Sequence, residues 1–175
     1  MTDKELFETY NRDVYRTCYY MVHHASDAED LCQDVFITIF RSDWQQVQQL
    51  RAWIIKVAVN LCLNHLRRRR SLRDKLLSYS QFWARPAPDT PDLLTANRES
   101  EAEWAVYFSR LPVKIRTVIS LRYVHDLSLN EIAGILEIPV GTVKSRQHKG
   151  LQLLRHILEQ QGQHGNLKGG HYETY

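Results

Sequence analysis

The sequence predicts an all-α protein made of two small helical bundles joined by a proline-rich linker. Apolar residues recur at intervals of three and four along most of the chain, which places them on one face of each helix. The 175 residues include only 7 glycines and 5 prolines, too few for a turn-rich β architecture. Three of the prolines fall close together near the middle of the chain, at Pro86, Pro88 and Pro91.

Three helices are predicted in the first bundle, over residues 1–70. Apolar residues between Leu6 and Val22 follow helical spacing, and Ser26 with Glu29 matches a capping box at the start of a second helix. The segment from Phe40 to the glutamine-rich QQVQQ interrupts the pattern, which predicts a loop. The third helix is expected over residues 50–70, with a buried side formed by Ile54, Val57, Ala58 and Leu61.

Residues 71–100 are predicted to be a flexible linker. No apolar periodicity continues beyond Leu77, and polar proline-rich segments bury too little surface to offset their ordering entropy. We therefore expect the two bundles, 1–70 and 101–160, to be separate domains. The glycine-containing residues 161–175 are expected to form a disordered tail.

Composition excludes several classes of protein. No apolar run approaches the ~18 residues of a membrane span, and the first residues lack the apolar segment of a signal peptide, so we expect a cytoplasmic protein without membrane insertion. The three cysteines are an odd number without a CxxC pair, which argues against a disulfide framework or a zinc site. The motifs of phosphate loops, zinc proteases and catalytic triads are absent, so neither enzymatic activity nor a cofactor is expected.

A helix-turn-helix is predicted in the second bundle. Ser128 and Glu131 match a capping box, followed by a short helix with apolar residues at i, i+3, i+4 and i+7. Pro139 cannot continue that helix, and a second helix is expected to begin by about Thr142. A short turn that contains Gly141 joins the two helices, as in helix-turn-helix motifs.

The second helix of this motif is strongly basic. Residues 142–157 include basic side chains and no acidic one, and the whole segment 104–175 has an excess of positive charge. We predict that Lys144, Ser145, His148 and Lys149 contact base edges in a major groove, whereas Arg146 contacts phosphate or braces the preceding helix. The alternative is a solvated basic face on a structural helix.

The third helix of the first bundle carries a polar face that could bind unpaired bases. Trp53, Lys56, Asn60, Asn64 and Arg67 follow one another by three or four residues. An ordinary polar surface is the alternative, and residues 67–70, all arginine, could either stabilise the helix end or neutralise phosphate.

Two further features lie near this face. Phe40 and Trp44 flank the predicted loop and could stack on bases, although burial in the core is equally open for Phe40. On the second helix, Asp27, Asp30, Gln33 and Asp34 form an acidic patch that by itself would be interpreted as solvated surface.

Three stretches together resemble a known family. SDAEDLCQDVFITIF, LRAWIIKVAVNLCLNHLRRR and SLNEIAGILEIPVGTVKSR are similar to regions 2 and 4 of bacterial sigma factors, in particular the extracytoplasmic-function (ECF) subfamily of the sigma-70 family. The resemblance covers residues 5–70 and 101–158. Gln147 departs from it, because the family usually has an apolar residue there, and His148 is not a constant family choice.

The resemblance implies a role for each surface in transcription initiation. Asp30, Gln33 and Asp34 would bind the clamp of core RNA polymerase, and the second bundle would contact the flap. The −10 promoter element would be melted and captured by Phe40, Arg41, Trp44, Lys56, Asn60, Asn64 and Arg67. The −35 element would be bound as duplex DNA by Thr142, Lys144, Ser145, Arg146, His148 and Lys149. An anti-sigma factor would be a further partner, and the linker would pass through polymerase toward the RNA exit path.

Two other hypotheses stay open at this point. The chain could be a stand-alone helix-turn-helix regulator that dimerises through its first bundle, or a nucleic-acid-processing enzyme with an unrecognised carboxylate site. Under the sigma hypothesis each surface binds weakly alone, and polymerase raises affinity by tethering both. Weak DNA binding by the free chain is therefore expected.

Overall fold

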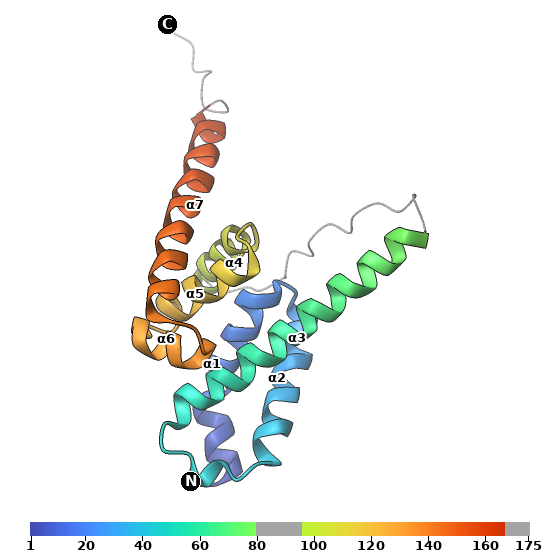
Figure 1. The fold of residues 1–175 in the computed structure, drawn as a ribbon, viewed down its shortest axis with the longest axis vertical. Helices are drawn as coiled ribbons and strands as arrows, with labels where there is room; N and C mark the ends of the chain where they lie inside the picture. The colour runs from blue at the N-terminus through green and yellow to red at the C-terminus, as the bar shows by residue number, and fades with distance from the viewer. Residues whose placement is uncertain (80–95, 167–175) are drawn as a thin grey trace, which may run out of the picture.

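The computed structural model describes the backbone of residues 1–79 and 96–166, and the side chains of residues 1–74 and 102–160. Over these ranges the protein is all-α, as predicted, with seven α-helices and one short 3-10 helix. Figure 1 shows α1 to α3 grouped at the N-terminal end of the molecule and α4 to α7 beside them. We refer to these groups as the N-terminal bundle and the C-terminal bundle.

The N-terminal bundle consists of α1 (Asp3–Val22), α2 (Ala25–Phe40) and α3 (Leu50–Tyr79), with the 3-10 helix η1 (Trp44–Gln46) before α3. A capping box begins α1: the Thr2 hydroxyl accepts from the Glu5 backbone N–H, and the Glu5 carboxylate accepts from the Thr2 backbone N–H at 2.7 Å. The helix ends at His23, which adopts the left-handed conformation.

The predicted capping box of Ser26 with Glu29 is wrong. Helix α2 already begins at Ala25, and its cap is His24, whose ring nitrogen Nδ1 accepts from the backbone N–H of Asp27 at 3.4 Å. Ser26 is exposed within the first turn. Because the histidine ring already accepts from a free N–H of the first turn, the Ser26 hydroxyl is not required as the N-cap.

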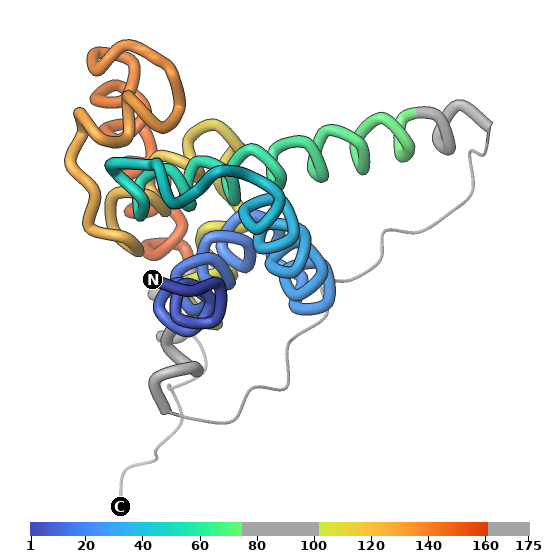
Figure 2. The backbone as a smooth tube through the Cα atoms, turned by 90° about the horizontal axis from the view of Figure 1, so that it is seen from below, coloured from blue at the N-terminus to red at the C-terminus, as the bar shows by residue number. Residues whose placement is uncertain are grey.

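Helix α3 is longer than predicted. It continues past Arg70 to Tyr79, so residues 71–79 are helical and not part of a linker. This stretch is rich in Leu, Arg and Lys, which favour helix, and a helix that has already formed extends at little cost. Its C-terminal part projects away from both bundles (Figures 1 and 2). The three clustered prolines lie outside the described residues.

The C-terminal bundle consists of α4 (Ala96–Ser109), α5 (Val113–Tyr123), α6 (Leu129–Leu136) and α7 (Val140–Asn166). Helix α4 begins within the predicted linker, and α7 extends six residues into the predicted tail. The predicted capping box is present: the Ser128 backbone N–H donates to Glu131 at 2.7 Å, and the Glu131 N–H donates to the Ser128 hydroxyl at 3.2 Å. Residues 128–146 therefore form a helix-turn-helix, as predicted, but α7 already begins at Val140, so Gly141 lies in the first turn of α7 and not in the connecting turn.

The two bundles pack against each other, whereas separate domains were expected. Helix α1 contacts α4 and α5, and α3 contacts α6. One apolar cluster joins α1, α2 and α3 to residues of α4 and α5, such as Phe108 and Ile115. A second cluster joins Ile55 and Val59 of α3 to the helix-turn-helix. In Figure 2 the first half of α3 accordingly runs between α1 and α2 on one side and the helix-turn-helix on the other.

Candidate nucleic-acid and polymerase interfaces

The first turns of α7 present the side chains predicted to contact duplex DNA. Lys144, Ser145, His148 and Lys149 are exposed, while Thr142 and Arg146 are half-buried. On the opposite side of the same helix, Val143 is fully buried and packs in the apolar cluster of the helix-turn-helix.

Gly150 fixes how closely α7 lies on α5. A Cβ atom at this position would lie 2.5 Å from the side chain of Ile119, closer than real side chains approach. The absence of a side chain at Gly150 therefore lets α7 contact α5 directly.

Gln147, which departs from the family pattern, has a polar partner. Its side-chain amide nitrogen donates to the Tyr123 hydroxyl at 3.0 Å, and the residue is half-buried. The polar side chain at this position therefore packs against α5 with a hydrogen-bond partner of its own.

The predicted polar face of α3 is only partly open. Asn60, Asn64 and Arg67 are exposed, but the Lys56 ammonium donates to the Glu137 carboxylate at 2.7 Å. Glu137 lies at the turn between α6 and α7 in the left-handed conformation, with φ of 54°. The hydrogen bond and charge of Lys56 hold the pKa of Glu137 below its usual value.

The two aromatic residues predicted to stack on bases differ in exposure. Phe40, for which burial was equally open, is 38% exposed at the end of α2 and packs on Phe36 with ring centroids 5.8 Å apart. Trp44 is only 3% exposed, and its indole N–H donates to Asp3 at 3.1 Å. In this conformation Trp44 is part of the core and is not available for stacking. Arg41, the C-cap of α2, is exposed.

The acidic residues of α2 divide into two groups. Asp27 binds α3, since its carboxylate accepts from Arg69 at 2.8 Å and lies 3.4 Å from the ring of His65. Asp30, Gln33 and Asp34 are exposed on the outer face, and no ion pair involving them occurs among the described side chains. This face is available to a partner without loss of an internal contact.

Two histidines lie where the bundles meet: His125 is buried and His23 is half-buried. Burial lowers the pKa of His125 to about 4, and burial together with the neighbouring Arg116 lowers the pKa of His23 to about 3. Arg116 is itself 6% exposed, and burial lowers its pKa to about 10. The Nδ1 atom of His125 and the Nε atom of Arg116 have no hydrogen-bond partner.

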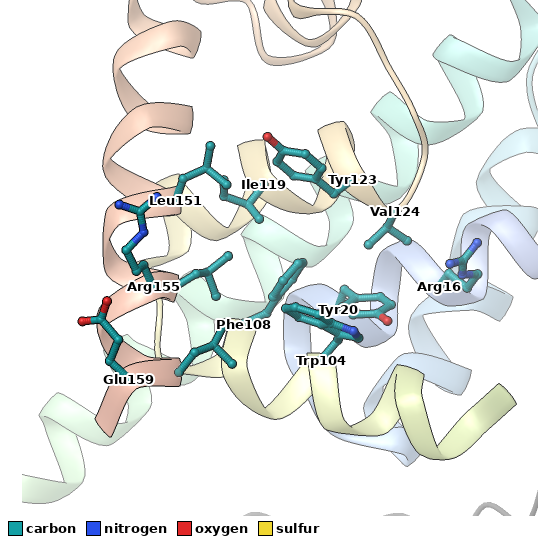
Figure 3. A pocket seen from close by; sticks show the side chains of 12 residues that line it. Arg16, Tyr20, Trp104, Phe108, Ile119, Tyr123, Val124, Leu151, Arg155 and Glu159 are labelled. Atoms are coloured by element: carbon teal, nitrogen blue, oxygen red, sulfur yellow. The ribbon is translucent and has the colours of Figure 1, made fainter. Parts of the chain in front are cut away.

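An apolar groove of about 870 Å³ lies between the bundles, lined from α1, α4, α5 and α7. Figure 3 shows Trp104 beside Tyr20 at one end, and Leu151 and Arg155 of α7 at the other. Trp104 is 44% exposed and Leu151 is 42% exposed, which is high for large apolar side chains. The groove is a candidate surface for a protein partner.

Two other kinds of site are absent from the part of the chain that the structure describes. No helix there is both long and apolar enough to cross a membrane. No group of three or more His, Cys, Asp or Glu side chains within the same residues could hold a metal ion.

Comparison with known families identifies both halves. The family model "Sigma-70 region 2" matches residues 6–72, and "Sigma-70, region 4" matches residues 107–156. The chain is 30% identical over 162 residues to the ECF RNA polymerase sigma factor SigW of Bacillus subtilis, covering 86% of each chain. This chain belongs to the ECF subfamily of the sigma-70 family of RNA polymerase sigma factors. The alternatives of a stand-alone regulator and a processing enzyme are therefore set aside.

Further comparisons agree with this assignment. The sigma factor is 28% identical to SigX of Bacillus subtilis, over 88% of this chain and 82% of that protein. Its fold is similar to that of RpoE from Bartonella quintana in complex with the anti-sigma factor NepR, with a TM-score of 0.70, 20% identity and coverage of 89% and 96%. It is also similar to CnrH in complex with the cytosolic domain of CnrY, with a TM-score of 0.63, 19% identity and coverage of 90% and 87%.

Two features of these surfaces escaped the sequence prediction. One is the pairing of Lys56 with Glu137, residues far apart in the chain, and no sequence pattern indicates it. The other is a second apolar stripe on α3, formed by Ile55 and Val59. The i, i+4 spacing of Ile55, Val59 and Leu63 could have revealed that stripe, had two buried faces been considered.

Proposed function

We propose that this sigma factor directs promoter-specific initiation by binding the −35 element as duplex DNA with α7 and capturing the −10 element on α3. The observation that carries the proposal is the presence of two separate polar surfaces on one chain, on α7 of the helix-turn-helix and on α3. Each surface supplies few contacts, so binding both elements at once requires a host that fixes their separation.

For the −35 element, the proposed contacts are Lys144, Ser145, His148 and Lys149 to base edges and Thr142 and Arg146 to the backbone. The proposal is supported by the exposure of Lys144, Ser145, His148 and Lys149, and by the position of all six residues on the first three turns of α7, the part of a recognition helix that enters a major groove. Residues 142–157 contain no acidic side chain, so no carboxylate on this segment would repel the DNA phosphates.

For the −10 element, the proposed contacts are Asn60, Asn64, Arg67, Lys56, Phe40 and Arg41. Asn side chains can both donate to and accept from base edges, and exposed Phe40 can stack on an unpaired base. Trp44 could join them only after leaving the core, and we assign it no contact in the conformation described above.

Core RNA polymerase is the proposed host, with its clamp bound by Asp30, Gln33 and Asp34 of α2 and its flap by the C-terminal bundle. Supporting this assignment, the three α2 side chains share one exposed face and have no internal ion-pair partner among the described residues. The proposed location is the cytoplasm, where the polymerase and promoter are found.

An anti-sigma factor is a further proposed partner. One structurally similar protein, the sigma factor RpoE of Bartonella quintana, is described in complex with the anti-sigma factor NepR. The apolar groove that contains Trp104 and Leu151 is the surface we assign to such a protein. A candidate protein should block transcription by the wild type and fail to block the Leu151→Glu variant.

Run-off transcription with core polymerase on a promoter library tests the main proposal. The expected result is transcription from a subset of templates that share two spaced elements, and none from core polymerase alone. A chain that fails to confer any choice of start site, while folded and bound to polymerase, would refute the assignment.

A further inference from the structure

Two side chains assigned to the −35 element already have a hydrogen-bond partner on α7 itself. The hydroxyl of Ser145 donates to the backbone carbonyl of Thr142 at 3.0 Å. The side-chain amide nitrogen of Gln152 lies 3.1 Å from Nε2 of His148. Ser145, His148 and Gln152 are exposed and follow one another at intervals of three and four residues, so they share one face of the helix. Each internal bond limits what Ser145 and His148 can offer to a base.

The bond to Thr142 leaves Ser145 as an acceptor. A hydroxyl has one hydrogen to donate and lone pairs that accept, and the hydrogen of Ser145 is used within the helix. In the major groove, the donors that such an oxygen can bind are the amino groups of adenine and cytosine. Ser145 therefore fits a base that carries an amino group.

The bond to Gln152 determines which ring nitrogen of His148 carries the proton. An amide nitrogen donates and does not accept, so Nε2 of His148 is the acceptor and the proton of the neutral ring lies on Nδ1. No residue in the described part of the chain binds Nδ1, so its N–H group can donate to a base. Guanine presents two acceptors in the major groove, N7 and O6, whereas cytosine presents a donor. His148 therefore fits guanine and opposes cytosine.

We infer that Gln152 is a positioning residue for promoter recognition: it holds His148 as a donor, beside Ser145 held as an acceptor. Helix α7 then selects guanine opposite His148 and an amino-bearing base opposite Ser145. The inference rests on the proposed binding of the −35 element by α7 and adds the chemistry of two of its bases. Without the Gln152 amide, the His148 ring can present either a donor or an acceptor through Nδ1, and the preference between guanine and cytosine is lost.

A second pair on α7 has the same form at a different place. The side-chain amide nitrogen of Gln160 lies 2.9 Å from Nε2 of His156, again four residues apart. Both residues are exposed, but they lie beyond the turns of α7 proposed to enter the groove. Gln160 is therefore a matched control for Gln152, because a contact that only stabilises the helix would have the same effect at both positions.

The position of the ring proton can be measured in the free chain. Nitrogen NMR spectroscopy distinguishes the two neutral forms of a histidine ring, and the signals that disappear in His148→Ala belong to His148. At about pH 8, where free imidazole is neutral, His148 should carry its proton on Nδ1. Gln152→Met removes the amide but keeps a side chain of similar length, so it should shift the proton toward Nε2. Gln160→Met should leave the His148 signals unchanged.

The consequence for specificity can be measured with core polymerase and a promoter library randomised in the −35 element. The His148→Ala variant identifies the base position that depends on His148. At this position the wild type should prefer guanine over cytosine by about two- to ten-fold, the range expected for one hydrogen bond. Gln152→Met should lose that preference, and Gln152→Lys, which keeps a donor, should retain it. Gln160→Met should select the same sequences as the wild type.

A double variant shows whether Gln152 acts through His148. In the His148→Ala background, Gln152→Met should cause no further change in base preference, because the ring that it positions is gone. A change at a different base position would mean that Gln152 contacts DNA directly, and it would overturn the positioning role.

The outcomes separate this inference from the proposed function. A His148 proton on Nε2 in the wild type, or an unchanged base preference in Gln152→Met, would overturn the positioning role and leave the binding of the −35 element by α7 intact. If a folded, polymerase-bound wild type enriches no −35 sequence, the proposed function fails and the assigned base preferences fail with it. The NMR measurement does not depend on DNA, so it decides separately whether Gln152 fixes the ring of His148.

Discussion

The ring of His125, at the turn between α5 and α6, lies 2.9 Å from the hydroxyl of Thr17 on α1. This contact joins the two halves of the sigma factor through a histidine that is 2% exposed. Burial is the main cause that lowers the pKa of this histidine. The nearby arginines, Arg16 and Arg51, lower it further, whereas the carboxylates of Asp13 and Asp126 raise it.

Stability should therefore fall in mild acid. The pKa of His125 is lowered to about 4, so below the ordinary value of about 6.5 the unfolded chain binds a proton that the folded chain does not. The free energy of unfolding should decrease by up to about 1.4 kcal/mol per pH unit between these values for this histidine. Urea unfolding from pH 7 to 4 measures it. His125→Asn should make the dependence shallower, with His23 accounting for the part that remains, whereas His156→Asn, at an exposed position on α7, should leave it unchanged.

Gly150→Ala should destabilise the C-terminal bundle despite the better helix propensity of alanine. The added Cβ would lie 2.5 Å from the Ile119 side chain, and we expect a cost of about 1–3 kcal/mol from overpacking. Gly134→Ala is the control, because nothing lies within 4 Å of its added Cβ, and it should stabilise the fold by up to about 1 kcal/mol. Thermal unfolding compares the two, and equal melting temperatures would contradict the close approach of α5 and α7.

Ser128→Ala should lower the free energy of unfolding by about 1 kcal/mol, because it removes the hydroxyl that caps α6. Ser26→Ala should have almost no effect, since His24 and not Ser26 caps α2. Denaturant titration of both variants checks the prediction. A similar loss in the two would show that the cap of α2 is misassigned.

Asp34→Lys should abolish binding to core polymerase while helicity stays intact, because it reverses the charge on the face assigned to the clamp. Asp27→Asn is the matched change on the same helix. This substitution should instead lower the free energy of unfolding by about 0.5–1 kcal/mol, because the ion pair with Arg69 is lost, and it should leave polymerase binding intact. Co-elution with core polymerase measures binding, and wild-type affinity in Asp34→Lys would place the docking face elsewhere.

Phe40→Ala and Trp44→Ala should impair different properties: the first should weaken DNA binding, and the second should lower the stability of the fold. Trp44 is 3% exposed, so its loss should cost about 3–5 kcal/mol of stability. Phe40 is 38% exposed, so its loss should change stability little and weaken binding of a single-stranded −10 oligonucleotide by about 1–3 kcal/mol. Denaturant unfolding measures the stability of both variants, and fluorescence anisotropy measures their affinity for the oligonucleotide. Together the two measurements distinguish a core residue from a DNA-contacting residue.

Several elements could be predicted because their causes are local. The capping box of Ser128 and Glu131 spans four residues, and α6 ends at Leu136, just before the Pro139 that cannot continue it, so no distant contact is needed for either. The exposed basic face of α7 follows equally from spacing. The candidate polymerase and −35 surfaces could therefore be placed from the sequence, although their roles came from the family resemblance.

Other features depended on residues far apart in the chain. The indole N–H of Trp44 binds Asp3, which buries a side chain that the loop sequence left free to be exposed. The start of α2 has a local cause instead: the ring of His24, and not the hydroxyl of Ser26, caps the helix by accepting from the backbone N–H of Asp27. Neither outcome has a periodic signature.

The amino-acid sequence by itself determined the helices, the helix-turn-helix and the family, because helical periodicity, caps and prolines act over a few residues. Only the tertiary structure decided that Ile55 and Val59 are covered by the C-terminal bundle and that Lys56 is taken by Glu137. Apolar residues on two sides of a helix indicate that both sides are buried, but they do not indicate which other helices cover them. That choice is made by the whole chain when it excludes water from its largest apolar surfaces.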